Sequence, residues 1–125
     1  MKKEVISTNN APKAIGPYSQ GHVVGDFVFT SGQIPLNPET GVLATEIKEA
    51  TKQSLENVKA ILEEAGTSLD KVVKTVVFVK NMDDFAQVNE VYGTYFTENQ
   101  PARSCVAVAK LPMDALIEIE AIAIK

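Results

Sequence analysis

The segment KVVKTVVFVKNMDDFAQVNEVYGTYFTENQPARSCVAVAK, residues 71–110, predicts a strand, a helix and a second strand. Residues 70–80 are rich in valine, which favours an extended strand. Residues 82–96 carry apolar side chains at helical spacing and start with acidic residues, which suit a helix N-terminus. Residues 102–110 are mostly small or β-branched and predict a strand again. A strand–helix–strand unit normally makes its two strands parallel, so the segment predicts an α/β arrangement.

The residues upstream predict a hairpin and a longer helix. Residues 45–66 place apolar side chains on one face and charged side chains on the other. Thr45 is expected to cap the start of this helix, and Gly66 is expected to end it. Residues 18–33 carry apolar runs on both sides of a Gly-Asp pair, which is typical of a β-hairpin. Residues 3–8 predict a further short strand.

The full order is strand, hairpin, helix, strand, helix, strand and strand, and residues 115–125 form the last strand. This order predicts an α/β (α+β) fold with a mixed six-stranded sheet, and right-handed crossovers would bring both helices to one face. From the second helix, five side chains are expected to face the core: Phe85, Val88, Val91, Tyr92 and Tyr95. Several strands are apolar on both sides, which is typical of strands buried on both faces. Because the predicted elements leave no helix or strand to cover the other face of the sheet, a symmetric homo-oligomer is expected to cover it.

The composition limits the class of protein. With 125 residues, 45% of them hydrophobic and 22% charged, the chain predicts one globular domain over residues 1–125. The net charge of −4 argues against nucleic acid or an anionic membrane as a partner. The single cysteine cannot form an internal disulfide, and the N-terminal residues lack the apolar run of a signal peptide. No apolar stretch is long enough to cross a bilayer, so we expect a cytoplasmic protein.

Arg103, the only arginine in the chain, is the first candidate for chemistry. Strand alternation places it on one side with small side chains, which leave room around its guanidinium group. Glu118 and Glu120 form a second unusual feature, because they lie on one side of an otherwise apolar last strand. A buried charge without a partner is costly, so two interpretations are open. Either Arg103 pairs with a glutamate across neighbouring strands, within one chain or at a subunit interface, or it binds a small carboxylate or phosphate while a glutamate acts as acid or base.

Other side chains are weaker candidates. A Cys–His nucleophile needs both residues together, but His22, the only histidine, lies in the predicted hairpin, so Cys105 is expected to be a small hydrophobe. The spacing of His, Cys and Asp residues predicts no metal site. Gly32 allows a ligand to approach the main chain, and Tyr18 and Ser31 add hydroxyl groups.

Taken together, the segments resemble the RidA/YjgF family of reactive intermediate deaminases, almost from end to end. The resemblance is carried by APKAIGPYSQG, FVFTSGQIPLNPETG, QSLENVKAILEEAG, VVKTVVFVKNMDDFAQVNEVY, PARSCVAVAKLP and IEIEAIA. It implies a chorismate-mutase-like fold, a homotrimer, and equivalent clefts between subunits.

The resemblance also implies roles for particular residues. Arg103 in PARSCV matches the arginine that holds the substrate carboxylate, and Glu118 in IEIEA matches the acidic residue that handles the catalytic water. The positions that match cleft-lining residues are Tyr18, Ser31, Gly32, Asn89 and, through its backbone, Cys105. The chain departs from many relatives at Ala107 and Met113, which puts the substrate specificity in question.

The implied activity is hydrolysis of 2-imino acids, the tautomers of enamines such as 2-aminoacrylate, to 2-keto acids and ammonia. No metal or organic cofactor is expected, because an iminium carbon is already a strong electrophile. Two alternatives stay open. The family has also been described as endoribonucleases or translation inhibitors, although the chain has no basic stripe and no stacking platform for RNA. A regulator that binds small metabolites without turnover is the other alternative.

Overall fold

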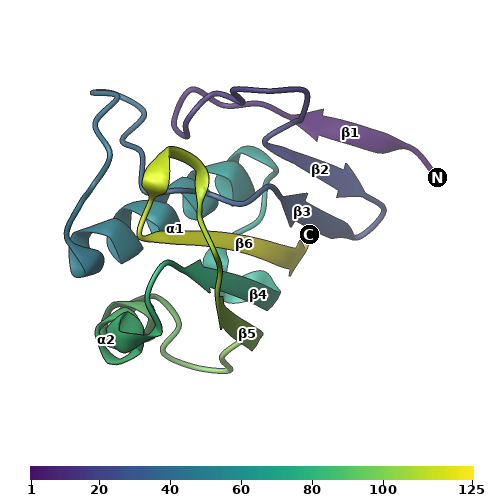
Figure 1. The fold of residues 1–125 in the computed structure, drawn as a ribbon. Coiled ribbons are helices and arrows are strands. Elements are labelled where there is room, and N and C mark those ends of the chain that lie inside the picture. Colours follow the sequence, from purple (N-terminus) through teal and green to yellow (C-terminus); the bar gives the residue numbers. More distant parts are fainter.

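The computed structural model describes residues 1–125 (Figure 1). Its strands are β1 (Lys3–Ile6), β2 (Gly21–Val24), β3 (Phe27–Thr30), β4 (Val72–Val79), β5 (Ala102–Ala107) and β6 (Ile117–Ile124). Its helices are α1 (Ile47–Glu64) and α2 (Phe85–Tyr95), and short 3-10 turns span Leu69–Lys71, Met82–Asp84 and Pro112–Asp114. The types and the order of the elements agree with the prediction, although the elements are shorter than the predicted ranges.

One mixed sheet contains all the strands, in the order β1-β2-β3-β6-β4-β5. Strands β4 and β5 are parallel, and every other neighbouring pair is antiparallel. The C-terminal strand β6 lies between β3 and β4, well inside the sheet, while β5 forms an edge (Figure 1). The predicted fold class, an α+β protein with a mixed six-stranded sheet, is therefore confirmed.

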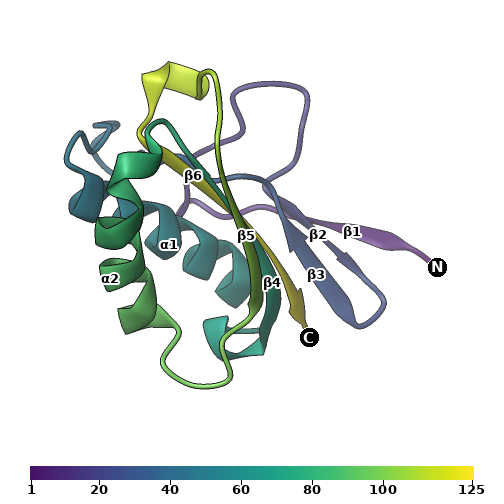
Figure 2. The same cartoon turned by 60° about the horizontal axis from the view of Figure 1, so that its bottom comes forward.

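Both helices lie on the same face of the sheet, as the crossovers predicted (Figure 2). The core between the helices and the sheet is a cluster of 20 buried apolar residues. Leu55, Val58 and Ile61 of α1 are fully buried, as are Ile117 and Ile119 of β6. Burying a side chain of this size contributes about 1.5–3 kcal/mol, so this face of the sheet is well stabilised within one chain.

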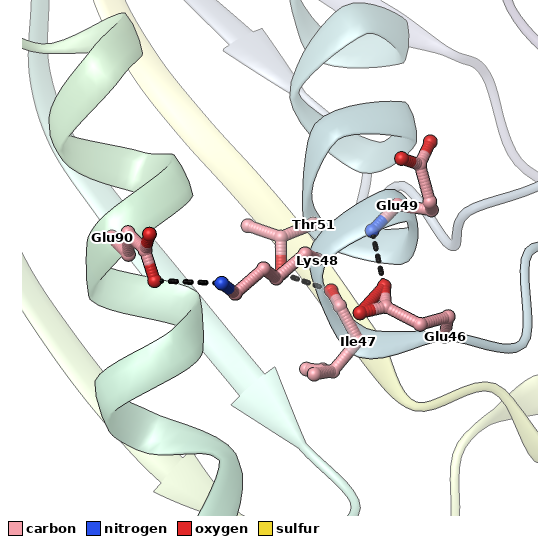
Figure 3. A network of polar contacts seen from close by, with 6 residues as sticks. All are labelled: Glu46, Ile47, Lys48, Glu49, Thr51 and Glu90. Atoms are coloured by element: carbon pink, nitrogen blue, oxygen red, sulfur yellow. Dashed lines mark hydrogen bonds and ion pairs between the residues drawn. The ribbon is translucent and has the colours of Figure 1, made fainter.

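The ends of α1 differ in one respect from the prediction. The cap is Glu46 and not Thr45, because the helix begins at Ile47 and the Glu46 side chain accepts a hydrogen bond of 2.8 Å from the N–H of Glu49 (Figure 3). Thr45 lies one residue too far upstream to reach the free N–H groups of the first turn. At the other end, Gly66 has a φ of +86°, which a glycine adopts without strain, so its predicted role is confirmed.

The start of α2 is also more elaborate than expected. Asp83 lies in the 3-10 turn before the helix, and its N–H donates to the Asn81 side chain at 2.9 Å. The helix itself begins at Phe85.

Lys48 of α1 and Glu90 of α2 form an exposed ion pair at 2.9 Å that links the two helices (Figure 3). Exposed pairs of this kind add little stability, so packing holds the helices in place.

The sheet face opposite the helices has no cover from residues 1–125 (Figure 2). Four apolar side chains on it, Phe27, Phe29, Val106 and Ile124, are 46%, 41%, 43% and 42% exposed. Glu118 and Glu120 of β6 lie on the same face. Large apolar side chains left exposed on one sheet face indicate an interaction site, so this face remains the expected oligomer surface. Neither helix combines the length and the apolar character needed to span a bilayer.

Candidate functional site

Arg103 projects from β5 toward the helices, where only neutral groups surround it. Its Nη1 donates a 2.8 Å hydrogen bond to Oδ1 of Asn89, and its Cζ lies 4.8 Å from the ring centroid of Tyr92 and 5.4 Å from that of Phe85. The ion pairs of the chain are Lys48–Glu90 and Lys80–Asp114, and neither involves Arg103. The interpretation that Arg103 pairs with a glutamate is therefore wrong within one chain. Since a guanidinium has five N–H donors, most of its hydrogen-bonding capacity is free.

The Phe85 side chain does not face the core as predicted. It is 37% exposed and lies over the guanidinium group of Arg103, whereas Val88 and Tyr92 of the same helix are buried. Helical periodicity alone cannot distinguish a core position from one at the rim of the helix face, where an aromatic ring can cover a cation. Tyr95 is half-buried and donates a 2.7 Å hydrogen bond to Glu56 of α1.

Cys105 is half-buried on the same side of β5 as Arg103. Burial raises the pKa of its thiol, and the charge of Arg103 acts in the opposite direction. His22 lies on β2 opposite Phe29, far along the sheet from β5, so no Cys–His pair forms. The thiol therefore has no base to activate it, as the sequence predicted.

The backbone N–H of Cys105 faces the open edge of the sheet. The N–H of Val108 donates to the carbonyl oxygen of Val79 on β4. Because alternate residues of a strand point their backbone groups in the same direction, the N–H groups of Arg103 and Cys105 point away from β4, toward the open edge of the sheet. This edge thus offers a guanidinium group and backbone donors together.

Glu118 lies away from Arg103, in a cavity of about 340 Å³ at the point where the chain leaves β3. Reciprocal backbone hydrogen bonds between Gln33 and Ile119, at 2.8 and 3.1 Å, hold the residues after β3 against β6. This pairing places Gly32 beside Glu118. The residues that line the cavity are Ile15, Tyr18, Ser31, Gly32, Ile34, Pro112 and Glu118.

Gly32 is required by this close approach. A Cβ atom at this position would lie 2.4 Å from Oε2 of Glu118, which is far inside van der Waals contact. The N–H of Gly32 makes no hydrogen bond within the chain, so it is free to donate to a ligand. Ser31 is held by a 2.5 Å hydrogen bond from its hydroxyl to the Ser19 carbonyl, and the Tyr18 hydroxyl accepts a long 3.4 Å bond from the N–H of Ile15.

The Glu118 carboxyl group is suited to proton transfer. Burial raises its pKa above the ordinary value, and the nearby charge of Glu120 raises it further. No hydrogen bond or ion pair within the chain holds it in the charged form. A carboxyl group with a raised pKa keeps its proton to a higher pH than an ordinary one, which favours a role in proton transfer.

The two places lie on opposite faces of the sheet. Arg103 pairs with Thr75 and Glu118 pairs with Phe78, and these two partners lie three residues apart on β4, so their side chains point in opposite directions. Strand β4 also separates β5 from β6, which places the two backbones about 10 Å apart across the sheet. One chain therefore brings Tyr18, Ser31, Gly32 and Glu118 together in one half-site, which we call the Glu118 half-site. It brings Asn89, Arg103 and Cys105 together in another, the Arg103 half-site.

The other parts of the chain contribute less. A larger cavity, of about 630 Å³, lies between α1 and the loop around Asn37 and contains none of the predicted site residues. No group of three or more His, Cys, Asp or Glu side chains is arranged to hold a metal ion. Ala107 lies exposed near the end of β5, and Met113 lies in the turn next to Pro112 with 54% of its surface exposed.

Sequence reasoning missed the apolar wall of the Glu118 cavity, formed by Ile15, Ile34 and Pro112. These residues belong to irregular segments, where no periodicity indicates which way a side chain points. Ile15 and Tyr18, in the segment between β1 and β2, become part of a site only because they line the same cavity as Glu118 at the start of β6.

The fold and the half-sites define a small α+β protein with a free guanidinium group at one sheet edge and a carboxyl group of raised pKa in a separate pocket. The chain belongs to the endoribonuclease L-PSP family, the RidA/YjgF proteins, whose sequence pattern matches residues 8–125. A RutC family protein of Pyrococcus abyssi is 60% identical over 126 residues, covering 100% of this chain and 99% of the relative. A 2-iminobutanoate/2-iminopropanoate deaminase of Salmonella typhimurium is 56% identical and covers 98% of each chain.

A solved structure extends the comparison to three dimensions. The crystal structure of Escherichia coli TdcF with bound serine superposes with a TM-score of 0.94 at 50% identity, and the match covers 98% of each chain. The similarity in fold and in sequence therefore extends over nearly the whole chain.

Proposed function

We propose that this protein hydrolyses small 2-imino acids, such as 2-iminobutanoate and 2-iminopropanoate, to 2-keto acids and ammonia. Relatives that are 54–56% identical are named for this reaction. The observation that carries the proposal is the environment of Arg103, whose half-buried guanidinium group is held by Asn89 and two aromatic rings and has no acidic partner within its own chain. A charge held in this way is prepared to bind an organic carboxylate in two parallel hydrogen bonds.

The functional site forms between two copies of the chain, each of which contributes one half-site. A 2-imino acid is too small to contact Arg103 and Glu118 of one chain, because they project from opposite faces with β4 between them. The exposed apolar sheet face gives the copies a surface through which to associate. A closed ring of copies, here a homotrimer, pairs every Arg103 half-site with a Glu118 half-site.

The reaction divides between the two half-sites. Arg103 binds the substrate carboxylate, and the free backbone N–H groups of Cys105 and Gly32 are available to orient the substrate. Glu118 accepts a proton from a water molecule as the water oxygen bonds to the imine carbon, which gives a carbinolamine. The carboxyl group of Glu118 then returns this proton to the nitrogen. For the iminium form of the substrate, the carbon–nitrogen bond then breaks and ammonia leaves, while the Glu118 carboxylate takes the hydroxyl proton as the carbonyl of the 2-keto acid forms and passes it to solvent water. These steps involve no metal and no organic cofactor.

The test follows 2-aminoacrylate or 2-iminobutanoate as a pyridoxal-phosphate-dependent dehydratase generates it. The wild-type protein should accelerate keto-acid formation, and Arg103→Ala should abolish the acceleration. Arg103→Lys should also lose most of it, because an ammonium group cannot reproduce the planar fork of a guanidinium. Full activity in Arg103→Ala would refute the assignment.

The family description favours one rival function, cleavage of RNA. The net charge of −4 and the single histidine argue against it, because phosphodiester cleavage normally relies on cationic groups and on acid–base pairs. Incubation of the purified protein with RNA, beside Arg103→Ala prepared in the same way, separates the two functions. Cleavage by the wild type alone, without imine hydrolysis, would establish the rival. Stoichiometric binding of 2-keto acids without turnover would indicate a metabolite-binding regulator.

A further inference from the structure

We propose that Tyr92 and Phe85 are positioning residues for Arg103, two rings that hold its guanidinium plane ready for a carboxylate without neutralising its charge. We call these two rings the aromatic cradle. The proposal rests on the proposed role of Arg103 and adds the question of how a lone arginine is kept in place. The cradle belongs to α2, which crosses the face of the sheet where Arg103 emerges.

Tyr92 is the more tightly held of the two rings in the cradle. Its ring centroid lies 4.8 Å from Cζ of Arg103, within the range in which a cation is attracted to an aromatic face. The Tyr92 hydroxyl and Oγ1 of Thr75 form a hydrogen bond of 2.7 Å. Tyr92 is 6% exposed and Thr75 is 1% exposed, so this bond is shielded from water. The ring is thus fixed by β4, the strand next to the one that carries Arg103.

Unlike an ion pair, the aromatic cradle leaves the charge and the N–H groups of Arg103 available to a ligand. A carboxylate partner would neutralise the guanidinium and would occupy the two parallel N–H groups that a substrate needs. An aromatic face attracts the cation and takes up none of its N–H groups in a conventional hydrogen bond. Asn89 takes only one N–H of Arg103. The orientation of the group is restricted, while its charge and its fork remain free.

The first measurement compares substitutions of Tyr92 in the dehydratase-coupled assay. Tyr92→Leu should lower kcat/KM by roughly 5- to 30-fold, the range expected for a cation–π contact that is shielded from water. Tyr92→Phe keeps the ring and should recover most of this loss. Tyr95→Leu is the matched control, since it removes another hydrogen-bonded tyrosine of the same helix, one that does not contact Arg103. An equal loss in Tyr95→Leu would overturn the proposal.

A double-mutant cycle distinguishes positioning from general support of the fold. If the cradle orients the guanidinium plane, Arg103→Lys should cost much less in the Tyr92→Leu background than in the wild type, because a misaligned fork has little advantage over an ammonium group. If the two losses simply multiply, Tyr92 does not orient Arg103 and the proposal is wrong.

A replacement variant and a binding measurement complete the experiment. If Tyr92→Leu does not fold, Phe85→Leu replaces it in the cycle, because Phe85 is 37% exposed and its loss leaves the core intact. The loss of kcat/KM caused by Arg103→Lys should again be smaller in the Phe85→Leu background than in the wild type. If the two losses of kcat/KM simply multiply, the aromatic cradle is again contradicted. Binding of 2-oxobutanoate by calorimetry accompanies each variant. If Arg103→Ala changes neither binding nor turnover, the proposed function itself fails; if Arg103→Ala abolishes both and the cycle shows no coupling, only the cradle fails.

Discussion

The carboxyl group of Glu118 packs so closely against the α-carbon of Gly32 that a side chain at residue 32 would force the carboxyl group to move. A Cβ atom on Gly32 would lie 2.4 Å from Oε2 and 2.6 Å from the carboxyl carbon of Glu118. The contact depends on the backbone pairing of Gln33 with Ile119, which holds the chain after β3 beside β6.

Gly32→Ala should therefore displace the Glu118 carboxyl group and lower kcat while the fold is retained. The loss should approach that of Glu118→Gln, about 10²- to 10⁴-fold for removal of a general acid–base group. Steady-state kinetics with 2-iminobutanoate measure the effect. The control is Gly93→Ala on α2, where an added Cβ meets no atom within 4 Å. Unchanged kcat in Gly32→Ala would show that the position of Glu118 does not limit the reaction.

Separate half-sites on one chain predict complementation between two inactive variants. Arg103→Ala keeps an intact Glu118 half-site, and Glu118→Gln keeps an intact Arg103 half-site. If the two proteins are unfolded, mixed in equal amounts and refolded together, about one quarter of all clefts in the refolded mixture should contain both native half-sites. Activity should return to about a quarter of the wild-type value by the same statistics.

Each variant refolded alone is the control for this mixture and should stay inactive. Recovery is measured in the dehydratase-coupled assay, with light scattering to give the mass of the assembly. An assembled mixture without recovered activity would mean that Arg103 and Glu118 do not share a cleft.

The raised pKa of Glu118 has a consequence for stability. The folded protein binds this proton more tightly than the unfolded chain does, so ionisation of Glu118 opposes folding. The cost is absent below the ordinary pKa of 4.5 and is complete once the pH exceeds the raised value. Glu118→Gln should therefore be more stable than the wild type at pH 7, and its advantage should shrink as the pH falls toward 4.

Denaturant unfolding at several pH values measures this difference. Glu63→Gln, a change at an exposed carboxyl group of α1, is the control for the loss of one negative charge. An advantage of Glu118→Gln that grows as the pH falls would contradict the direction of the shift.

Replacing Met113 with glycine should increase the stability of the protein. It lies in the turn before β6 with a φ of +57°, in the left-handed region that costs a residue with a Cβ atom about 1–2 kcal/mol. Met113→Gly should stabilise the protein by roughly 0.5–1 kcal/mol after the greater flexibility of glycine in the unfolded chain is subtracted. Met113→Ala keeps the Cβ atom and should give no gain. A lower unfolding midpoint in Met113→Gly than in Met113→Ala would contradict this reasoning.

Local patterns predicted much of the fold. The valine-rich strand, the amphipathic helices and the alternation along β5 depend on near neighbours, and all are found in the structure. Two predictions for single residues were wrong. Thr45 was expected to cap α1, but the helix begins at Ile47 and Glu46 is the cap. Phe85 has the right spacing for a core residue but lies at the rim, over Arg103.

The order of the residues is enough to indicate that a lone guanidinium and an acidic pair occur in apolar strands, because side-chain alternation follows from the backbone geometry of each strand. The three-dimensional fold was needed to show that β6 inserts between β3 and β4, that Gly32 contacts Glu118, and that Arg103 lies on the other face. Strand order and the contacts of loops depend on residues far apart in the chain, and no local period encodes them.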